Sequence, residues 1–253
     1  MGVLVTAEQT LAGQQSALSK ETQWLRRFTT FEIALACGFL IAGLAVRAVG
    51  GGWLPLIIGG VLAFLAAAHL YKQRENVRQQ RIIAAGQQGE ARITRLLERD
   101  LAPDCYVLND ITIPFARRSA QIDHLVISPQ GVFLFETKNW GGALSGDAQA
   151  EKWTQIRSRD GKRVQLSNPI RQVARQANFM QQFLKAHGFD AVPVYPAVVF
   201  SNSRTTWDAH SGEAPLLRPD EIPEFVYATP TAPDFGFERV RELVRALSGK
   251  ELL

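Results

Sequence analysis

Two long apolar segments near the start of the chain constrain its fold more than any other feature. Residues 28–49 read FTTFEIALACGFLIAGLAVRAV, residues 53–71 read WLPLIIGGVLAFLAAAHLY, and three glycines separate them. Each segment is long enough to cross the hydrocarbon core of a bilayer, which takes about 20 residues. The sequence therefore predicts a tight transmembrane hairpin of two helices. The alternative is a pair of core helices in a soluble fold, which the lack of a regular polar face disfavours.

The charge distribution predicts how such a hairpin is oriented. The chain has 28 Lys and Arg residues and 24 Asp and Glu residues; eight of these bases and four of these acids precede residue 82, which leaves 20 of each in the remainder. The basic excess thus lies beside the apolar segments rather than in the rest of the chain. Because basic residues flank both outer ends of the hairpin, both termini are expected in the cytoplasm and the hairpin in the inner membrane. Because the high isoelectric point of the chain comes from these flanking bases, it gives no support for nucleic-acid binding.

The sequence after the hairpin alternates between helix and strand patterns. Glu90, Ile93, Leu97 and Leu101 form one helical stripe, and short β-prone runs follow at 106–113, 122–128 and 132–137. Asn168-Pro169 is typical of a helix start, and the apolar stripe continues to about residue 188, before a strand at 194–200. This order predicts a mixed α/β fold in which helices cover a sheet. Residues 201–234 are expected to form an extended surface segment with a short helix near 219–227, and a last helix is expected at 237–247.

These patterns divide the chain into five parts. They are a cytoplasmic N-terminal segment (1–27), the transmembrane hairpin (28–71), a juxtamembrane helix (72–88), an α/β domain (89–200) and a C-terminal extension (201–253). The two cysteines, Cys37 and Cys105, lie far apart in unlike surroundings, so no disulfide framework is predicted. Neither cysteine nor any of the four histidines has the spacing of a zinc site or of a Cys/His catalytic pair.

The turn Pro129-Gln130-Gly131 places two acids opposite each other. A two-residue turn there makes 122–128 and 132–137 an antiparallel hairpin and pairs Asp123 with Glu136, so that their Cβ atoms lie about 5 Å apart. Lys138 projects from the same strand face as Glu136. Two opposed carboxylates can share one hard cation. A salt bridge from Lys138 to one acid, with the other acid solvated, explains the same pattern, and geometry alone leaves both interpretations open.

Five sequence pieces together resemble a known family. They are Gly89-Glu90, Gln121-Ile122-Asp123-His124, Pro129-Gln130-Gly131, Glu136-Thr137-Lys138-Asn139-Trp140-Gly141 and Asn168-Pro169-Ile170-Arg171-Gln172. In this order they resemble the nuclease-related domain, NERD, a branch of the PD-(D/E)XK nuclease superfamily whose bacterial members often carry transmembrane helices. The resemblance covers roughly residues 90–200 and implies a restriction-endonuclease-like α/β core.

The resemblance implies a role for each matching residue. Asp123 and Glu136 correspond to the metal-binding acids, Lys138 to the lysine of the E-x-K element, Glu90 to the acid of the first core helix, and Gln172 to the glutamine of the following helix. The alternative for Glu90 is a solvated acid at a helix start, which its place on the Ile93 and Leu97 stripe disfavours. Gln172 could equally be a polar residue of a helix start that packs against the loop after Asn139. The implied enzyme is a phosphodiester hydrolase that uses Mg²⁺ or Mn²⁺, bound by Asp123 and Glu136, to activate water.

Basic residues near the predicted β-hairpin, at 122–137, are candidate contacts to nucleic acid. They are Arg117, Arg118, Lys152, Arg157 and Arg171. DNA is expected rather than RNA, and the lipid bilayer is the other expected partner. The alternative to a nuclease is a membrane-tethered nucleic-acid-binding or scaffold module with weak or no hydrolytic activity. Two opposed acids beside a lysine favour the enzyme, because binding alone does not need them.

Overall fold

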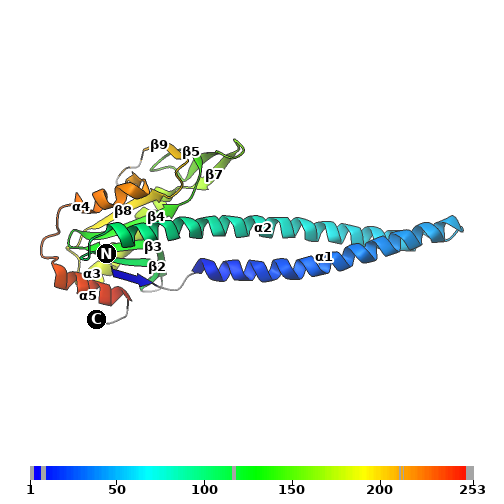
Figure 1. Cartoon of the computed structure of the whole chain (residues 1–253), viewed down its shortest axis with the longest axis horizontal. Coiled ribbons are helices and arrows are strands. Elements are labelled where there is room, and N and C mark those ends of the chain that lie inside the picture. Colours follow the sequence, from blue (N-terminus) through cyan, green and yellow to red (C-terminus); the bar gives the residue numbers. More distant parts are fainter. Residues whose placement is uncertain (1–2, 7–9, 116–117, 211, 213, 249–253) are drawn as a thin grey trace. The chain divides into compact units, whose positions relative to one another are not determined.

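The computed structural model of the chain describes residues 3–6, 10–115, 118–210, 212 and 214–248. The chain divides into a helical unit, Thr10–Ala85, and an α/β unit formed by Met1–Gln9 with Gly86–Leu253. The predicted fold class is confirmed, since the chain combines two long apolar helices with mixed sheets that helices cover (Figure 1).

The helical unit is an antiparallel pair made of α1 (Thr10–Ala48) and the first part of α2 (Leu54–Asp100). Gly50 closes the turn with φ of +81°, a value that glycine adopts without strain. The helices pack closely at two glycines, because a Cβ on Gly43 would lie 2.7 Å from Leu56 and one on Gly59 would lie 2.8 Å from Leu40. Residues 72–88 continue α2 without a break.

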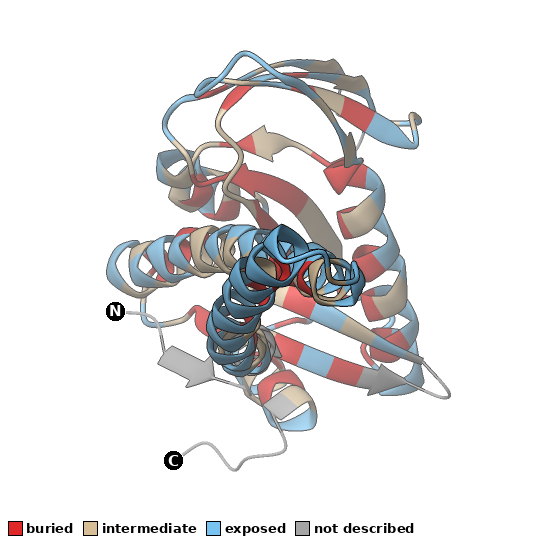
Figure 2. Ribbon diagram, turned by 90° about the vertical axis from the view of Figure 1, so that its right-hand side faces the viewer, coloured by how far each residue is buried: buried red, intermediate tan, exposed pale blue. Residues whose placement is uncertain are grey.

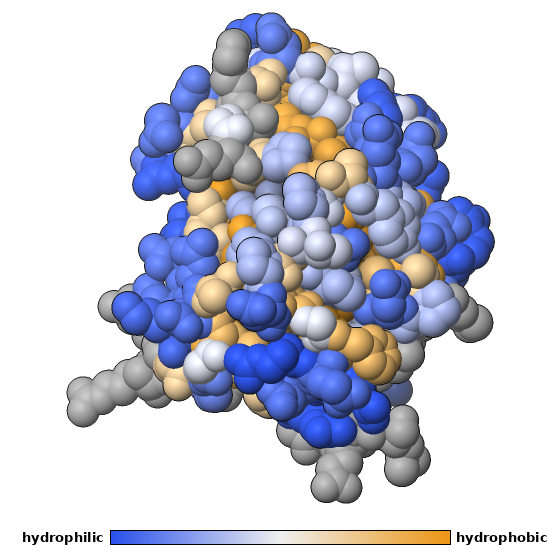
Figure 3. Space-filling view, turned by 90° about the vertical axis from the view of Figure 1, so that its left-hand side faces the viewer, coloured by the Kyte–Doolittle hydropathy of each residue, from blue (hydrophilic) through white to orange (hydrophobic). Residues whose placement is uncertain are grey.

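The helical unit leaves most of its apolar side chains exposed. Phe31, Ile41, Leu44, Ile57 and Phe64 are each at least 60% exposed. In Figure 2 the two long helices are largely exposed, while the central strands of the α/β unit, such as residues 131–138, are largely buried. By length and composition both helices can cross a membrane. By contrast, the face of the α/β unit seen in Figure 3 is mostly hydrophilic, with apolar residues in small separate areas.

The α/β unit is built on a six-stranded sheet in the order β1-β2-β3-β4-β8-β10. Its strands are β1 (Val3–Thr6), β2 (Tyr106–Phe115), β3 (Arg118–Ser128), β4 (Gly131–Lys138), β8 (Val194–Phe200) and β10 (Leu216–Leu217). Strands β3 and β4 form the predicted antiparallel hairpin, and their pairs run from Ser128 with Gly131 to His124 with Phe135. The register predicted from the turn is therefore confirmed. Strand β8 continues the sheet in parallel with β4.

Helices cover both faces of this sheet. One face packs against the C-terminal part of α2 and against α4 (Ile222–Tyr227), which follows the 3₁₀ turn η1 (Pro219–Glu221); Ile93, Leu97 and Phe133 lie in this core. The other face packs against α3 (Pro169–Ala186) and α5 (Phe237–Ser248). The helices expected after Asn168, near 219–227 and at 237–247 are all present.

A second sheet was not predicted. It has the order β7-β6-β5-β9, with β5 (Gly142–Asp147), β6 (Lys152–Arg157), β7 (Arg163–Ser167) and β9 (Thr205–His210). The expectation that 201–234 is an extended surface segment is wrong for β9 and β10, because β9 pairs in parallel with β5 and β10 with β8. Such pairing joins segments far apart in sequence, which local residue patterns do not reveal.

Candidate active site

The two acids of the hairpin lie where the ladder between β3 and β4 ends. Asp123 and Glu136 are one position beyond the last pair, His124 with Phe135, and their alternation places them on the sheet face covered by α3. The Thr137 N–H donates to Asp123 Oδ2 at 2.9 Å. Here the side-chain carboxylate of β3 accepts a hydrogen bond of the kind that backbone carbonyls accept elsewhere in the ladder. Glu136 is only 2% exposed. The pairing thus brings two carboxylates together at the edge of a core.

Lys138 and two glutamines of α3 complete a hydrogen-bonded network around Glu136. Lys138 Nζ donates to Glu136 Oε1 at 2.5 Å and to Gln172 Oε1 at 3.1 Å. Gln176 Nε2 donates to Glu136 Oε2 at 2.9 Å and to the Gln121 carbonyl at 3.0 Å. Asn168 fixes the start of α3, since its Oδ1 accepts from the Ile170 N–H at 2.9 Å. The cap therefore sets the position of both glutamines relative to β4.

Glu90 approaches the same acids from α2. Burial first, and then the negative charges of Asp110 and Glu136, raise the pKa of Glu90 from 4.5 to about 7. Burial first, and then the charge of Glu136, also hold the pKa of Asp123 well above its usual range. These shifts have one physical cause, which is that several carboxylates are gathered away from water with Lys138 as the nearby cation.

Sequence reasoning missed two residues of this cluster. Gln176 lies four positions after Gln172, and that spacing on a helix places both on one face, so the signal was present. Asp110 lies on β2 between the pairs Asn109 with His124 and Ile111 with Ile122, which puts it beside Asp123. Its φ of +46° is uncommon for a residue other than glycine. No local pattern in the sequence marks it.

Comparison with known proteins finds a family that resembles the part of the chain holding these carboxylates. Residues 85–201 match the family described as the nuclease-related domain, NERD. This part of the chain is similar to that family and is called the NERD domain for that reason. The chain is also 38% identical over 88 residues to an uncharacterized protein of Bacillus anthracis, an alignment that covers 34% of this chain and 41% of that relative. The chain therefore spans about two fifths of the length of the curated relative it matches. No solved structure matches the chain.

The NERD domain holds every residue that the resemblance singled out as catalytic. Glu90, Asp123, Glu136, Lys138 and Gln172 all lie within the matched residues and in the α/β unit. The structure brings these five together, through the bonds of Lys138 to Glu136 and Gln172 and through the mutual charge effects of Glu90, Asp123 and Glu136.

The donor set of the NERD domain fits a hard divalent cation. Asp123 and Glu136 offer four carboxyl oxygens beside the ammonium group of Lys138, and the buried Gln176 Oε1 has no hydrogen-bond partner among the described residues. Both Glu136 oxygens accept a bond but keep further lone pairs. Across the described residues no group of three or more His, Cys, Asp or Glu is placed so that it could hold a metal ion. A pair of carboxylates is the kind of donor set through which proteins bind Mg²⁺, which keeps several of its waters.

The basic candidates of the NERD domain differ in what they offer a nucleic acid. Arg117 lies outside the described residues, as does the side chain of Arg118. Arg157 forms a two-point salt bridge to Asp160, at 3.0 and 2.5 Å, so its charge is already compensated. Lys152 and Arg171 are exposed, at the start of β6 and in the first turn of α3.

His124 lies outside the candidate site and is packed, as expected. Its Nδ1 lies 2.6 Å from Asn109 Oδ1, and burial lowers its pKa to about 3, so the ring is neutral. With β-strand alternation, it faces away from Asp123.

Proposed function

We propose that the NERD domain is a metal-dependent nuclease that hydrolyses phosphodiester bonds, with Mg²⁺ or Mn²⁺ as cofactor and DNA as the preferred substrate. The observation that carries the proposal is the arrangement of Asp123, Glu136 and Lys138 on two paired strands, with the Lys138 ammonium 2.5 Å from Glu136. Buried like charges are costly unless a function or a cation requires them, and perturbed carboxylates of this kind cluster at active sites.

Each side chain has a part in the proposed reaction. Asp123 and Glu136 would hold the cation, which would supply a Lewis acid for the scissile phosphate and for the attacking water. Lys138 places a positive charge where charge develops on the phosphate, and Gln172 orients its ammonium group by accepting a bond at 3.1 Å. Glu90, whose pKa is about 7, can accept or release a proton near neutral pH.

The helical unit supports the proposal that the nuclease is anchored to the inner membrane with both termini in the cytoplasm. Only 17% and 11% of the most apolar stretches of α1 and α2 are buried within the chain, so lipid is a suitable environment for the remainder. The basic residues that flank the hairpin on its outer side favour the cytoplasmic orientation.

The test is a cleavage assay on the full chain with DNA and RNA substrates, with and without Mg²⁺ or Mn²⁺. Asp123→Asn and Lys138→Ala should each lower the cleavage rate about 100-fold or more, because each removes a charge that acts on the reacting phosphate. Glu242→Gln is the matched control, since Glu242 is an exposed acid of α5 that pairs with Arg239. Equal cleavage by all four proteins would assign the activity to a contaminant. Binding of nucleic acid without metal-dependent cleavage would favour the tethered binding or scaffold module.

A further inference from the structure

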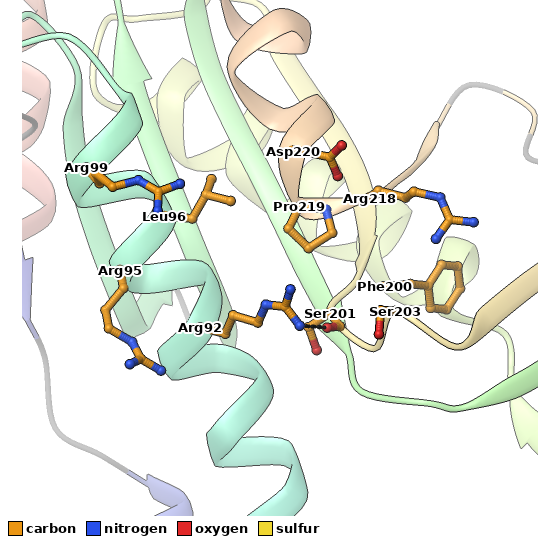
Figure 4. Close-up of a pocket in the computed structure, with 10 residues that line it drawn as sticks. All are labelled: Arg92, Arg95, Leu96, Arg99, Phe200, Ser201, Ser203, Arg218, Pro219 and Asp220. Atoms are coloured by element: carbon orange, nitrogen blue, oxygen red, sulfur yellow. Dashed lines mark hydrogen bonds between the residues drawn. The ribbon is translucent and has the colours of Figure 1, made fainter.

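A row of arginines borders a groove on the side of α2 that does not face the sheet. Arg92, Arg95 and Arg99 follow each other at intervals of three and four residues, which places them along one helical stripe. Arg218, just before η1, lies across the groove from them (Figure 4). The cavity between these elements measures about 890 Å³, and Ser201, at the end of β8, lines it as well.

The positive charge of this groove is largely uncompensated. Among the described residues, no salt bridge involves Arg92, Arg95 or Arg218, whereas Arg99 is held by Asp100 at 2.6 and 2.7 Å. Asp220 is the one acid among the residues drawn in Figure 4. Guanidinium groups gathered this way repel one another, so an anion in the groove would stabilise the arrangement.

The guanidinium groups are oriented but keep unused donors. Arg92 Nη1 donates to the Ser201 carbonyl at 3.0 Å, and Arg95 Nε donates to the Ala91 carbonyl at 3.1 Å. Arg218 lies 4.9 Å from the centre of the Trp207 ring. Because an arginine side chain has five N–H donors, each of these groups can still bind phosphate oxygens, singly or in a two-point contact.

The groove adjoins the carboxylate site through the backbone. Ser201 N donates to the Lys138 carbonyl at 3.1 Å, so the end of β8 that lines the groove is bonded to the strand that carries the candidate lysine. Glu90, whose charge interacts with those of Asp123 and Glu136, lies two positions before Arg92 on α2. The groove therefore lies beside the chain segments that carry Glu90 and Lys138.

We propose that this groove binds the phosphate backbone of one nucleic-acid strand beside the cleavage site, an inference that rests on the proposed nuclease function. At 1.5 Å per residue, the stripe from Arg92 to Arg99 extends about 10 Å along the helix axis, which suits a row of phosphates better than one isolated phosphate. Contacts to phosphate position a strand without reading its sequence.

The experiment measures binding without requiring cleavage. The full chain carrying Asp123→Asn is placed in phosphatidylcholine nanodiscs with EDTA, and fluorescence anisotropy follows a labelled single-stranded DNA at several salt concentrations. Adding Arg92→Gln and Arg95→Gln should raise the Kd about 10-fold and should reduce the slope of log K against log salt by about 0.7 for each lost contact. The control is Arg239→Gln, a half-buried arginine of α5 that already pairs with Glu242. Melting temperatures verify that all variants are folded.

Two results would overturn the groove assignment. One is an unchanged Kd and salt slope in the double variant. The other is that the embedded double variant loses affinity for added phosphatidylglycerol vesicles but not for DNA, which would make the groove a lipid site. Arginine-dependent DNA binding together with no cleavage by the wild-type chain would support the groove and contradict the nuclease, so the two proposals fail separately.

Discussion

Replacing Glu90 with Gln tests whether the carboxylates of the site repel one another. Burial and the charges of Asp110 and Glu136 raise the pKa of Glu90 from 4.5 to about 7. A group whose pKa is raised on folding contributes stability that is fully present below its unfolded pKa and is lost as pH rises through the folded value. Ionised Glu90 should therefore destabilise the native state above pH 7 and have little effect below about pH 4.5.

The size of the effect follows from the same shift. Taken in full, it corresponds to about 3 kcal/mol, but the side chain is only partly buried, so solvent screening reduces the expected effect to roughly 1–2 kcal/mol. For a protein of this size that is about 3–6 °C in melting temperature. Glu90→Gln keeps the side-chain volume and removes the charge, so at pH 8 in EDTA the variant should melt that much higher than the wild type.

The assay is thermal unfolding of the full chain in detergent at pH 5 and pH 8, each with EDTA and with Mg²⁺. The stabilisation should be only about a quarter as large at pH 5, where Glu90 is protonated in the folded state but already mostly ionised in the unfolded state, whose pKa is 4.5. Mg²⁺ should reduce it at pH 8, because a bound cation neutralises the same repulsion. A shift of equal size at both pH values would refute the electrostatic reasoning. A lower melting temperature for the variant at pH 8 would show that ionised Glu90 is stabilised by its surroundings.

Three further predictions concern the network, the topology and the helix cap. Lys138→Ala should lower the melting temperature, because it leaves the buried Glu136 without its cation. Adding Glu136→Gln should restore stability but not cleavage, and fully additive effects of the two substitutions on the melting temperature would contradict the coupling. In a background without the natural cysteines, Ser203→Cys should resist an impermeant thiol reagent in intact cells, whereas Gly52→Cys should react with it, since a Cβ on Gly52 meets open space. The reverse labelling pattern would show that the orientation is inverted. Asn168→Ala should cost about 2 kcal/mol in unfolding free energy, measured by denaturant titration, because it removes a cap and three bonds to backbone carbonyls; a loss below about 0.5 kcal/mol would count against that role.

Features encoded by neighbouring residues could be predicted without tertiary information. The turn at Pro129-Gln130 fixed the pairing that brings Asp123 and Glu136 together, because in a two-residue hairpin the turn sets the register of all following pairs. Strand alternation likewise put Lys138 on the same face as Glu136, and Asn168-Pro169 located the start of α3. These rules act over a few residues, so a single sequence is enough to apply them.

Features that depend on distant segments needed the folded chain. The second sheet exists because β9 pairs with β5, about 60 residues earlier in the sequence, and neither strand is apolar enough to stand out alone. The elevated pKa values of Glu90 and Asp123 arise only when α2, β2 and β4 meet around them. The arginine groove likewise forms where the outer side of α2 faces the end of β8 and η1. The sequence by itself determined which side chains are the candidates for the chemistry, while tertiary packing decided their electrostatic environment, because burial and charge depend on neighbours that only the fold brings together.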